Sequence, residues 1–132
     1  ETIDLPPRAE RRLPVPSSIQ RGPLGSRLTE LLRDGNAWRH QALALAMLEN
    51  RQNVLVGTGT ASGKSLIFQL FAFHQLQTDP QARVLIFYPL KALASDQYAR
   101  WQSMAGKFGL DPAAVVRIDG EVPTVERGEL LE

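Results

Sequence analysis

The residues whose types and spacing could do chemistry lie between positions 58 and 65. They form a run of small residues that ends in Gly-Lys-Ser: Thr58, Gly59, Thr60, Ala61, Ser62, Gly63, Lys64 and Ser65. An apolar stretch at 53–56 precedes the run, and a helix-like pattern at 66–76 follows it. In a strand–loop–helix of this kind, the loop N–H groups and the helix N-terminus converge on one point and bind phosphate oxygens. The run therefore predicts a loop that binds a nucleoside triphosphate.

Two side chains at the end of the loop add to this prediction. Lys64 can reach the β- and γ-phosphates, and the Ser65 hydroxyl can ligate a magnesium ion that those phosphates share. Thr58 stands where the strict pattern has glycine, and Gly57 lies one place too early. Because nucleotide-driven motor proteins tolerate threonine there, this departure favours a motor over a small GTPase. The alternative is a strand-to-helix turn that binds nothing.

Composition limits the class of protein. The 132 residues suffice for one small domain, and 15 basic against 14 acidic residues predict no partner from bulk charge. Absence of cysteine suits a reducing cytoplasm. No apolar stretch approaches the roughly 20 residues that span a bilayer, so we expect a cytoplasmic protein without a membrane partner.

The chain divides by composition near residue 25. Prolines and arginines alternate in residues 1–25, which predicts an extended arm, either a linker or a contact for nucleic acid or a partner subunit. Residues 26–132 read as the folded domain. Ser26 suits the N-cap of a short helix that ends near Gly35, and a second helix is expected over 38–50, before a strand at 54–57.

The second half alternates strands and helices. An apolar strand is predicted over 83–88, a helix over 90–108, a strand over 115–118 and a last helix over 125–131. With the loop and its helix, this β-α-β-α-β order specifies a doubly wound α/β domain. The apolar stripe of the long helix is expected to pack in the core: Leu90, Ala94, Tyr98, Trp101, Ala105 and Phe108. We interpret His40 and His74 as structural, because no spacing suggests metal ligation.

Several stretches, in order, resemble the first RecA-like domain of superfamily 2 DExD/H-box helicases. Arg39-His40-Gln41 looks like the Q motif, and Ala61 to Ser65 resembles motif I. Residues 89–97 look like motif Ia, and Asp119-Gly120 resembles a glycine turn that faces nucleic acid in that family. The amino-acid sequences of these motifs are most similar to those of a DNA helicase branch that includes bacterial mitomycin-repair and phage-defence helicases.

The resemblance implies a fold and a set of contacts. The fold is an α/β RecA-like P-loop domain, a parallel sheet with helices on both faces. ATP and Mg²⁺ are the implied cofactors, with Lys64 catalytic, Ser65 on the metal, the loop 58–65 on the phosphates and Gln41 on the adenine edge. Pro89, Leu90, Lys91 and Gly120 are implied to contact the phosphates of a DNA single strand.

The same resemblance indicates that the domain is incomplete in this chain. The family's Asp-Glu pair, which binds magnesium at a strand end, does not occur before Glu132. We therefore expect an ATP-binding part of a DNA helicase or translocase that acts in genome maintenance or phage defence, with the remaining helicase domains, and possible further subunits of a complex, as partners. Two alternatives stay open: a nucleotide switch or phosphotransferase without nucleic acid, and a non-catalytic module that docks on a partner.

Overall fold

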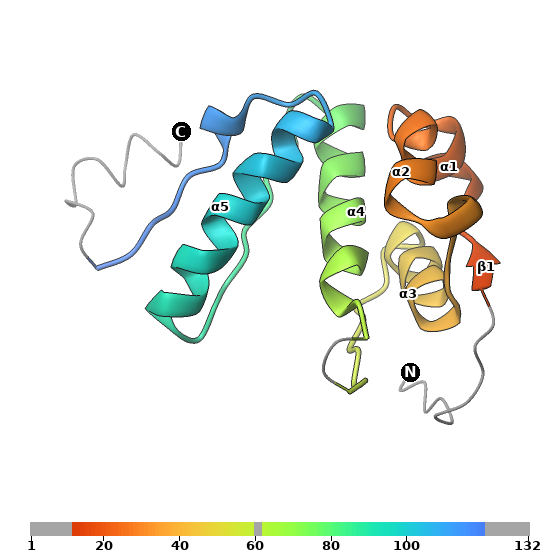
Figure 1. Cartoon of the computed structure of the whole chain (residues 1–132), viewed down its shortest axis with the longest axis horizontal. Coiled ribbons are helices and arrows are strands. Elements are labelled where there is room, and N and C mark those ends of the chain that lie inside the picture. Colours follow the sequence, from red (N-terminus) through yellow and green to blue (C-terminus); the bar gives the residue numbers. More distant parts are fainter. Residues whose placement is uncertain (1–11, 60–61, 121–132) are drawn as a thin grey trace. The chain divides into compact units, whose positions relative to one another are not determined.

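A computed structural model describes residues 12–59 and 62–120 of the chain (Figure 1). The chain forms two compact units, one up to Val84 and one from Leu85 onward. Within the described ranges, none of the helices combines the length and the apolar character needed to cross a bilayer. The helix predicted over 125–131 lies outside the described residues.

The first unit begins with a small antiparallel hairpin and short helical turns. Strand β1 (Arg12–Pro14) pairs with β2 (Asn36–Trp38), and Leu13 lies opposite Ala37. Between them run α1 (Ser17–Arg21), the 3-10 turn η1 (Gly25–Arg27), α2 (Leu28–Leu31) and the 3-10 turn η2 (Arg33–Gly35). The short helix predicted before Gly35 thus exists in broken form, and its N-cap is Arg27, not Ser26.

The prediction of an extended arm is wrong for residues 12–25. Val15, Ile19 and Leu24 are fully buried, so this segment contributes core residues. Its prolines do not prevent folding, because Pro14 ends a strand and Pro16 directly precedes α1, positions where a missing N–H costs little. Residues 1–11, which carry the rest of the predicted arm, lie outside the described residues.

Arg12 stabilises the hairpin through a cation–π contact and a hydrogen bond. Its guanidinium lies 4.1 Å from the centre of a Trp38 ring, and Nη1 donates to the Asn36 carbonyl at 3.2 Å. We expect Arg12→Ala to lower the free energy of unfolding by about 1 kcal/mol, because it removes a cation–π contact and a hydrogen bond. Urea unfolding followed by circular dichroism measures this, with the exposed Arg33→Ala as control. Equal stability of the two variants would contradict the role of Arg12.

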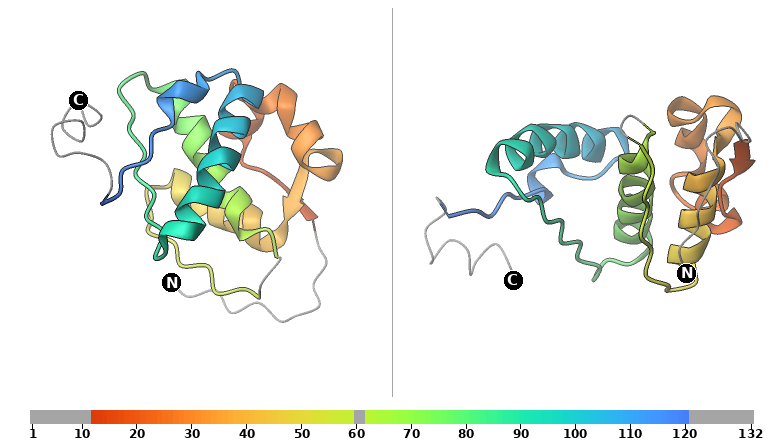
Figure 2. Two further views of the ribbon diagram at one scale, coloured as in Figure 1. Left: turned by 60° about the vertical axis from the view of Figure 1, so that its left-hand side comes forward. Right: turned by 90° about the horizontal axis from the view of Figure 1, so that it is seen from below.

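Two helices form the centre of the first unit. Helix α3 (Arg39–Glu49) packs against α4 (Lys64–Thr78), as Figures 1 and 2 show. Leu45 of α3 and Ile67, Leu70 and Phe73 of α4 are buried. Both helices match the ranges predicted from the sequence to within two residues at each end.

Near the C-terminal end of α3, burial raises the pKa of Glu49, and the nearby His74 partly lowers it again. A raised pKa means that the folded chain holds this proton more tightly than the unfolded chain does. The contribution of Glu49 to stability is therefore present at low pH and is lost as the pH rises through its folded pKa.

The predicted parallel sheet is not formed in the described residues, where β1–β2 is the one sheet. The stretches expected as strands, 54–57, 83–88 and 115–118, carry no ladder pairing (Figure 2). Leu55 and Phe87 consequently expose 81% and 87% of their surface. The physical reason is that strand backbone groups need a paired neighbour, and an apolar pattern along the chain does not specify that pairing. Apolar content alone therefore did not produce the sheet.

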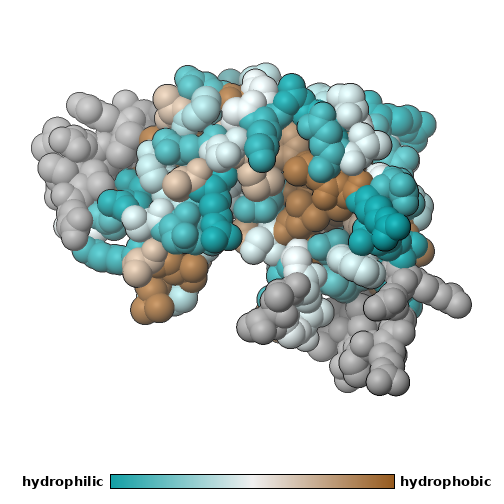
Figure 3. All heavy atoms as spheres, viewed as in Figure 1, coloured by the Kyte–Doolittle hydropathy of each residue, from teal (hydrophilic) through white to brown (hydrophobic). Residues whose placement is uncertain are grey.

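The second unit is built on α5 (Lys91–Lys107), which the sequence predicted. Its last turn leads through Gly109, whose φ of 78° is left-handed, to the 3-10 turn η3 (Pro112–Ala114). Trp101, Ala105 and Phe108 are buried, as expected of the apolar stripe. Leu90, at the start of the stripe, is 65% exposed, and Figure 3 shows apolar surface where α5 begins.

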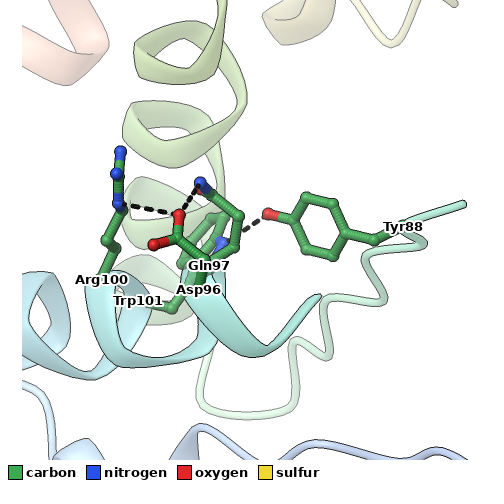
Figure 4. Close-up of polar contacts among 5 residues, drawn as sticks. All are labelled: Tyr88, Asp96, Gln97, Arg100 and Trp101. Atoms are coloured by element: carbon green, nitrogen blue, oxygen red, sulfur yellow. Dashed lines mark hydrogen bonds and ion pairs between the residues drawn. The ribbon is translucent and has the colours of Figure 1, made fainter. Parts of the chain in front are cut away.

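Polar contacts fix the middle of α5. The indole N–H of Trp101 donates to the Tyr88 hydroxyl at 3.0 Å (Figure 4). Asp96 accepts from Gln97 at 3.1 Å and pairs with Arg100 at 3.3 Å on the exposed face. Because Tyr88 lies in the stretch before α5, the Trp101 contact connects that stretch to the helix.

Candidate nucleotide-binding site

The predicted phosphate loop leads directly into α4. Gly63 is the N-cap, with φ 75° and ψ 25°, and Lys64 is the first residue of the helix. Only glycine adopts this left-handed conformation without a penalty, which explains why glycine precedes the lysine. A left-handed residue followed by helical ones turns successive N–H groups to one side and forms a nest that suits an anion. Thr60 and Ala61, also predicted to bind phosphate, lie outside the described residues.

Lys64 lies over its own loop. Its ammonium group donates to the carbonyl oxygens of Thr58 and Gly59, each at 2.6 Å. The charge of Lys64 is therefore held where the loop is expected to receive phosphate. These carbonyls are neutral acceptors, and a phosphate oxygen with full negative charge is a stronger one. The arrangement keeps the lysine ready to exchange carbonyl partners for an anion.

Thr58, the residue that departs from the strict pattern, also has a contact within the loop. Its hydroxyl lies 2.6 Å from the Ser62 hydroxyl, four residues later. A glycine at position 58 has no side chain for this bond. The Thr58 side chain thus links the two ends of the loop. The difference from the strict P-loop pattern does not by itself reveal this contact.

Gln41 lies against the loop from α3. Its Nε2 donates to the Gly63 carbonyl at 2.9 Å, and its Oε1 accepts from the Trp38 N–H at 2.9 Å. The residue is 2% exposed. The structure thus brings the Q-motif glutamine to the phosphate loop, and both ends of its amide have partners. Contact between Gln41 and a base therefore requires that this buried amide become accessible.

His40 also contacts the loop, which the sequence analysis missed. Its Nε2 lies 3.0 Å from the Ser62 carbonyl oxygen. A carbonyl oxygen can only accept, so Nε2 carries the proton in this bond. His40 and Ser62 are 22 positions apart, and no spacing rule connects them. Its place beside Gln41 is the one sequence signal that could have indicated this contact.

Ser65 is the predicted magnesium ligand. It lies in the first turn of α4 and is exposed. A hydroxyl oxygen fits magnesium, which prefers hard oxygen ligands and keeps several waters. Within the described ranges, no group of three His, Asp or Glu residues could hold a metal ion. The Ser65 hydroxyl therefore fits the chemistry of a magnesium ligand, and Ser65 is the described residue that would hold the ion.

The residues predicted to contact nucleic acid gather at the start of α5 in the second unit. Lys91 opens α5, directly after the exposed Pro89 and Leu90. A Cβ built on Gly120 would lie 4.0 Å from the Lys91 ammonium nitrogen, so these two residues are neighbours.

Arg117 holds the segment that leads to Gly120. It donates to the Ser95 hydroxyl at 3.1 Å and pairs with Asp119 at 3.2 Å. The two stretches that resemble nucleic-acid motifs, around Lys91 and around Gly120, are therefore close in the structure.

Comparison with known proteins identifies the family of the chain. Residues 38–131 match the model of the DEAD/DEAH box helicase family. The chain is 40% identical over 93 residues, or 70% of its length, to the ATP-dependent helicase HRQ1 of Saccharomyces cerevisiae. It is 29% identical over 111 residues, or 82% of this chain, to the uncharacterized ATP-dependent helicase YprA of Bacillus subtilis. It is 36% identical over 74 residues, or 53% of this chain, to the ATP-dependent DNA helicase Hel308 of Methanocaldococcus jannaschii.

The chain corresponds to a small part of these relatives. It covers 9% of HRQ1, 14% of YprA and 6% of Hel308. No solved structure gives a significant match. The family match includes the Q-motif region, the phosphate loop and the start of α5, and it extends over most of the chain. The chain therefore belongs to the DEAD/DEAH box helicase family, as the N-terminal part of such a helicase domain.

Proposed function

We propose that the protein containing these residues is an ATP-dependent DNA helicase or translocase, and that this chain supplies its ATP-binding part. The observation that carries the proposal is the loop that ends in left-handed Gly63 and places Lys64 at the start of α4. Family membership supports ATP as the nucleotide. The wording of the motifs supports the branch of mitomycin-repair and phage-defence helicases, and hence a role in genome maintenance or phage defence.

In this proposal each part of the site has a separate task. The loop amides and Lys64 neutralise the charge that develops on the phosphates during hydrolysis. Ser65 ligates Mg²⁺, which supplies further charge neutralisation when bound. Gln41 selects adenine after it leaves one of its present partners. The stretches 54–57, 83–88 and 115–118 become strands of the RecA-like parallel sheet when neighbouring strands pair with them.

In this proposal, residues of the second unit bind DNA. Lys91 and the N–H groups at the start of α5 bind the phosphates of one strand, with Pro89, Leu90 and Gly120 beside them. The proximity of Lys91 to Gly120 supports a common phosphate contact. Hel308 is named as a DNA helicase and other relatives are named as RNA helicases, so the choice of DNA in this proposal rests on the sequences of the motifs.

ATP hydrolysis by the complete protein, with and without single-stranded DNA, tests the proposal. We expect single-stranded DNA to increase the rate of ATP hydrolysis, and to increase it more than RNA of the same length and composition does. Hydrolysis without any response to nucleic acid would favour a nucleotide switch or phosphotransferase. Failure to bind any nucleotide would leave a module that docks on a partner.

Lys91 gives a sharper test of the DNA contact. We expect Lys91→Ala to weaken DNA binding by roughly threefold to tenfold for all sequences and to reduce the salt dependence by about one phosphate contact. Fluorescence anisotropy with labelled single-stranded DNA at several salt concentrations measures both. Lys107→Ala, at the other end of α5, is the matched control. Equal losses for the two variants would indicate bulk charge and contradict a contact at Lys91.

A further inference from the structure

Two neighbouring side chains of α3 hold two consecutive carbonyl groups of the phosphate loop. His40 Nε2 bonds the Ser62 oxygen at 3.0 Å, and Gln41 Nε2 bonds the Gly63 oxygen at 2.9 Å. The Gly63 oxygen also accepts from the Leu66 N–H within α4 at 3.2 Å. Ser62 lies before the first residue of α4, and His40 Nε2 is the described partner of its carbonyl.

The direction of a carbonyl fixes the direction of the next N–H. A trans peptide is planar, and its C=O and N–H point opposite ways. No cis peptide occurs in the described residues. When His40 draws the Ser62 oxygen toward α3, the N–H of Gly63 must point away from α3. That N–H belongs to the nest in which the loop is expected to bind phosphate.

We propose that His40 is a positioning residue of the nucleotide site, which aims the Gly63 N–H at the bound phosphates through its bond to the Ser62 carbonyl. The inference rests on the proposed function, since it names how that site is held. His40 touches neither nucleotide nor metal. Its effect reaches the phosphates through one peptide plane, so it is independent of the base.

Left-handed Gly63 makes this support necessary. A glycine has many accessible backbone conformations, and the peptide before it can rotate at little cost. A hydrogen bond from an ordered helix removes that freedom before the ligand arrives. Preorganised amides bind an anion more tightly, because no ordering is needed at the moment of binding.

The test compares two replacements of His40 in the complete protein. His40→Phe keeps a flat ring but has no donor, and His40→Gln keeps an N–H donor. Affinities are measured by calorimetry for ATP, GTP and inorganic triphosphate. We expect His40→Phe to weaken the binding of every ligand that the parent binds by a common factor of about ten, because the Gly63 N–H is no longer aimed and loses its hydrogen bond to a charged phosphate. His40→Gln should recover most of that affinity.

The control is Asn50→Ala at the other end of α3, where the side chain bonds the Ala46 carbonyl at 2.9 Å within the helix. It reports general loosening of α3 and should leave all affinities within twofold. Thermal unfolding of each variant confirms that the proteins compared are folded.

The outcomes separate this inference from the proposed function. A parent protein that binds none of the three ligands overturns the proposed function, and the inference with it. A parent that binds, with His40→Phe equally tight, overturns the inference alone. Weakening of ATP without weakening of inorganic triphosphate would place His40 on the base and also overturn it. A common loss that His40→Gln restores supports the inference.

Discussion

Lys64→Ala is expected to lower the rate of ATP hydrolysis by about a hundredfold to a thousandfold in the complete protein, the range found when one charge-stabilising donor is removed. Lys64 is the one lysine in the sequence of the loop and of α4. The loss should appear mainly in the rate constant at saturating ATP. Negative charge on the phosphates grows toward the transition state, and Lys64 then has its greatest effect.

Steady-state hydrolysis at saturating Mg²⁺ and ATP measures the effect, and Lys107→Ala is the charge-matched control. The bonds of Lys64 to Thr58 and Gly59 allow a second check. In the nucleotide-free protein, Lys64→Ala leaves the Thr58 and Gly59 carbonyls without the lysine. If the only effect of the substitution were a change in loop structure, the affinities for ADP and for ATP would fall equally. Unchanged hydrolysis in Lys64→Ala would contradict the assignment of this loop as the catalytic site.

The sequence predicted the helices around the site because their signals are local. The apolar periods of 66–76 and 90–108, with Gly63 and Pro89 before them, indicate where α4 and α5 begin. A phosphate loop is equally local, since its amides come from consecutive residues. These features depend on neighbours in the chain, and a pattern read along the chain contains them.

The remaining features depend on partners far along the chain. The hairpin of residues 12–14 with 36–38 brings the N-terminal segment into the core, although its prolines resemble those of a linker. The predicted sheet needed pairing that the apolar stretches do not specify by themselves. The bond between His40 and Ser62 spans 22 positions and is invisible to any spacing rule. Long-range pairing, not local propensity, therefore separates the structure from the sequence prediction.

Gln41 lies beside the phosphate loop, as the resemblance implied, but its burial and its hydrogen-bond partners were not predicted. The resemblance placed it at the nucleotide site, and the structure brings it within 2.9 Å of the Gly63 carbonyl. Its burial could not be predicted, because it depends on how α3 packs against α4, whereas its bond to the Trp38 N–H is a local contact at the start of α3. A polar residue this buried needs partners, and the loop backbone supplies one of them.

Gly63→Ala is expected to weaken nucleotide binding by about a hundredfold, because two costs act on the same residue. The left-handed conformation, with φ 75°, costs a residue with a Cβ about 1–2 kcal/mol. The added Cβ would also lie 2.6 Å from Gln41 Nε2, closer than real contacts allow. Gln41 would have to leave the Gly63 carbonyl, and a buried amide without its partner costs about 1–3 kcal/mol more.

A matched control and a second background separate these two costs. Gly57→Ala makes the same chemical change just before the loop, where an added Cβ meets nothing within 4 Å, and should leave binding nearly unchanged. In a Gln41→Ala background the contact at 2.6 Å disappears, and Gly63→Ala should then cost only the backbone strain, about tenfold. Calorimetric titration with inorganic triphosphate isolates phosphate binding from any contact of Gln41 with the base. If Gly63→Ala cost the same in both backgrounds, the contact with Gln41 would carry no energy, and the strain of the left-handed turn alone would explain the requirement for glycine at this position.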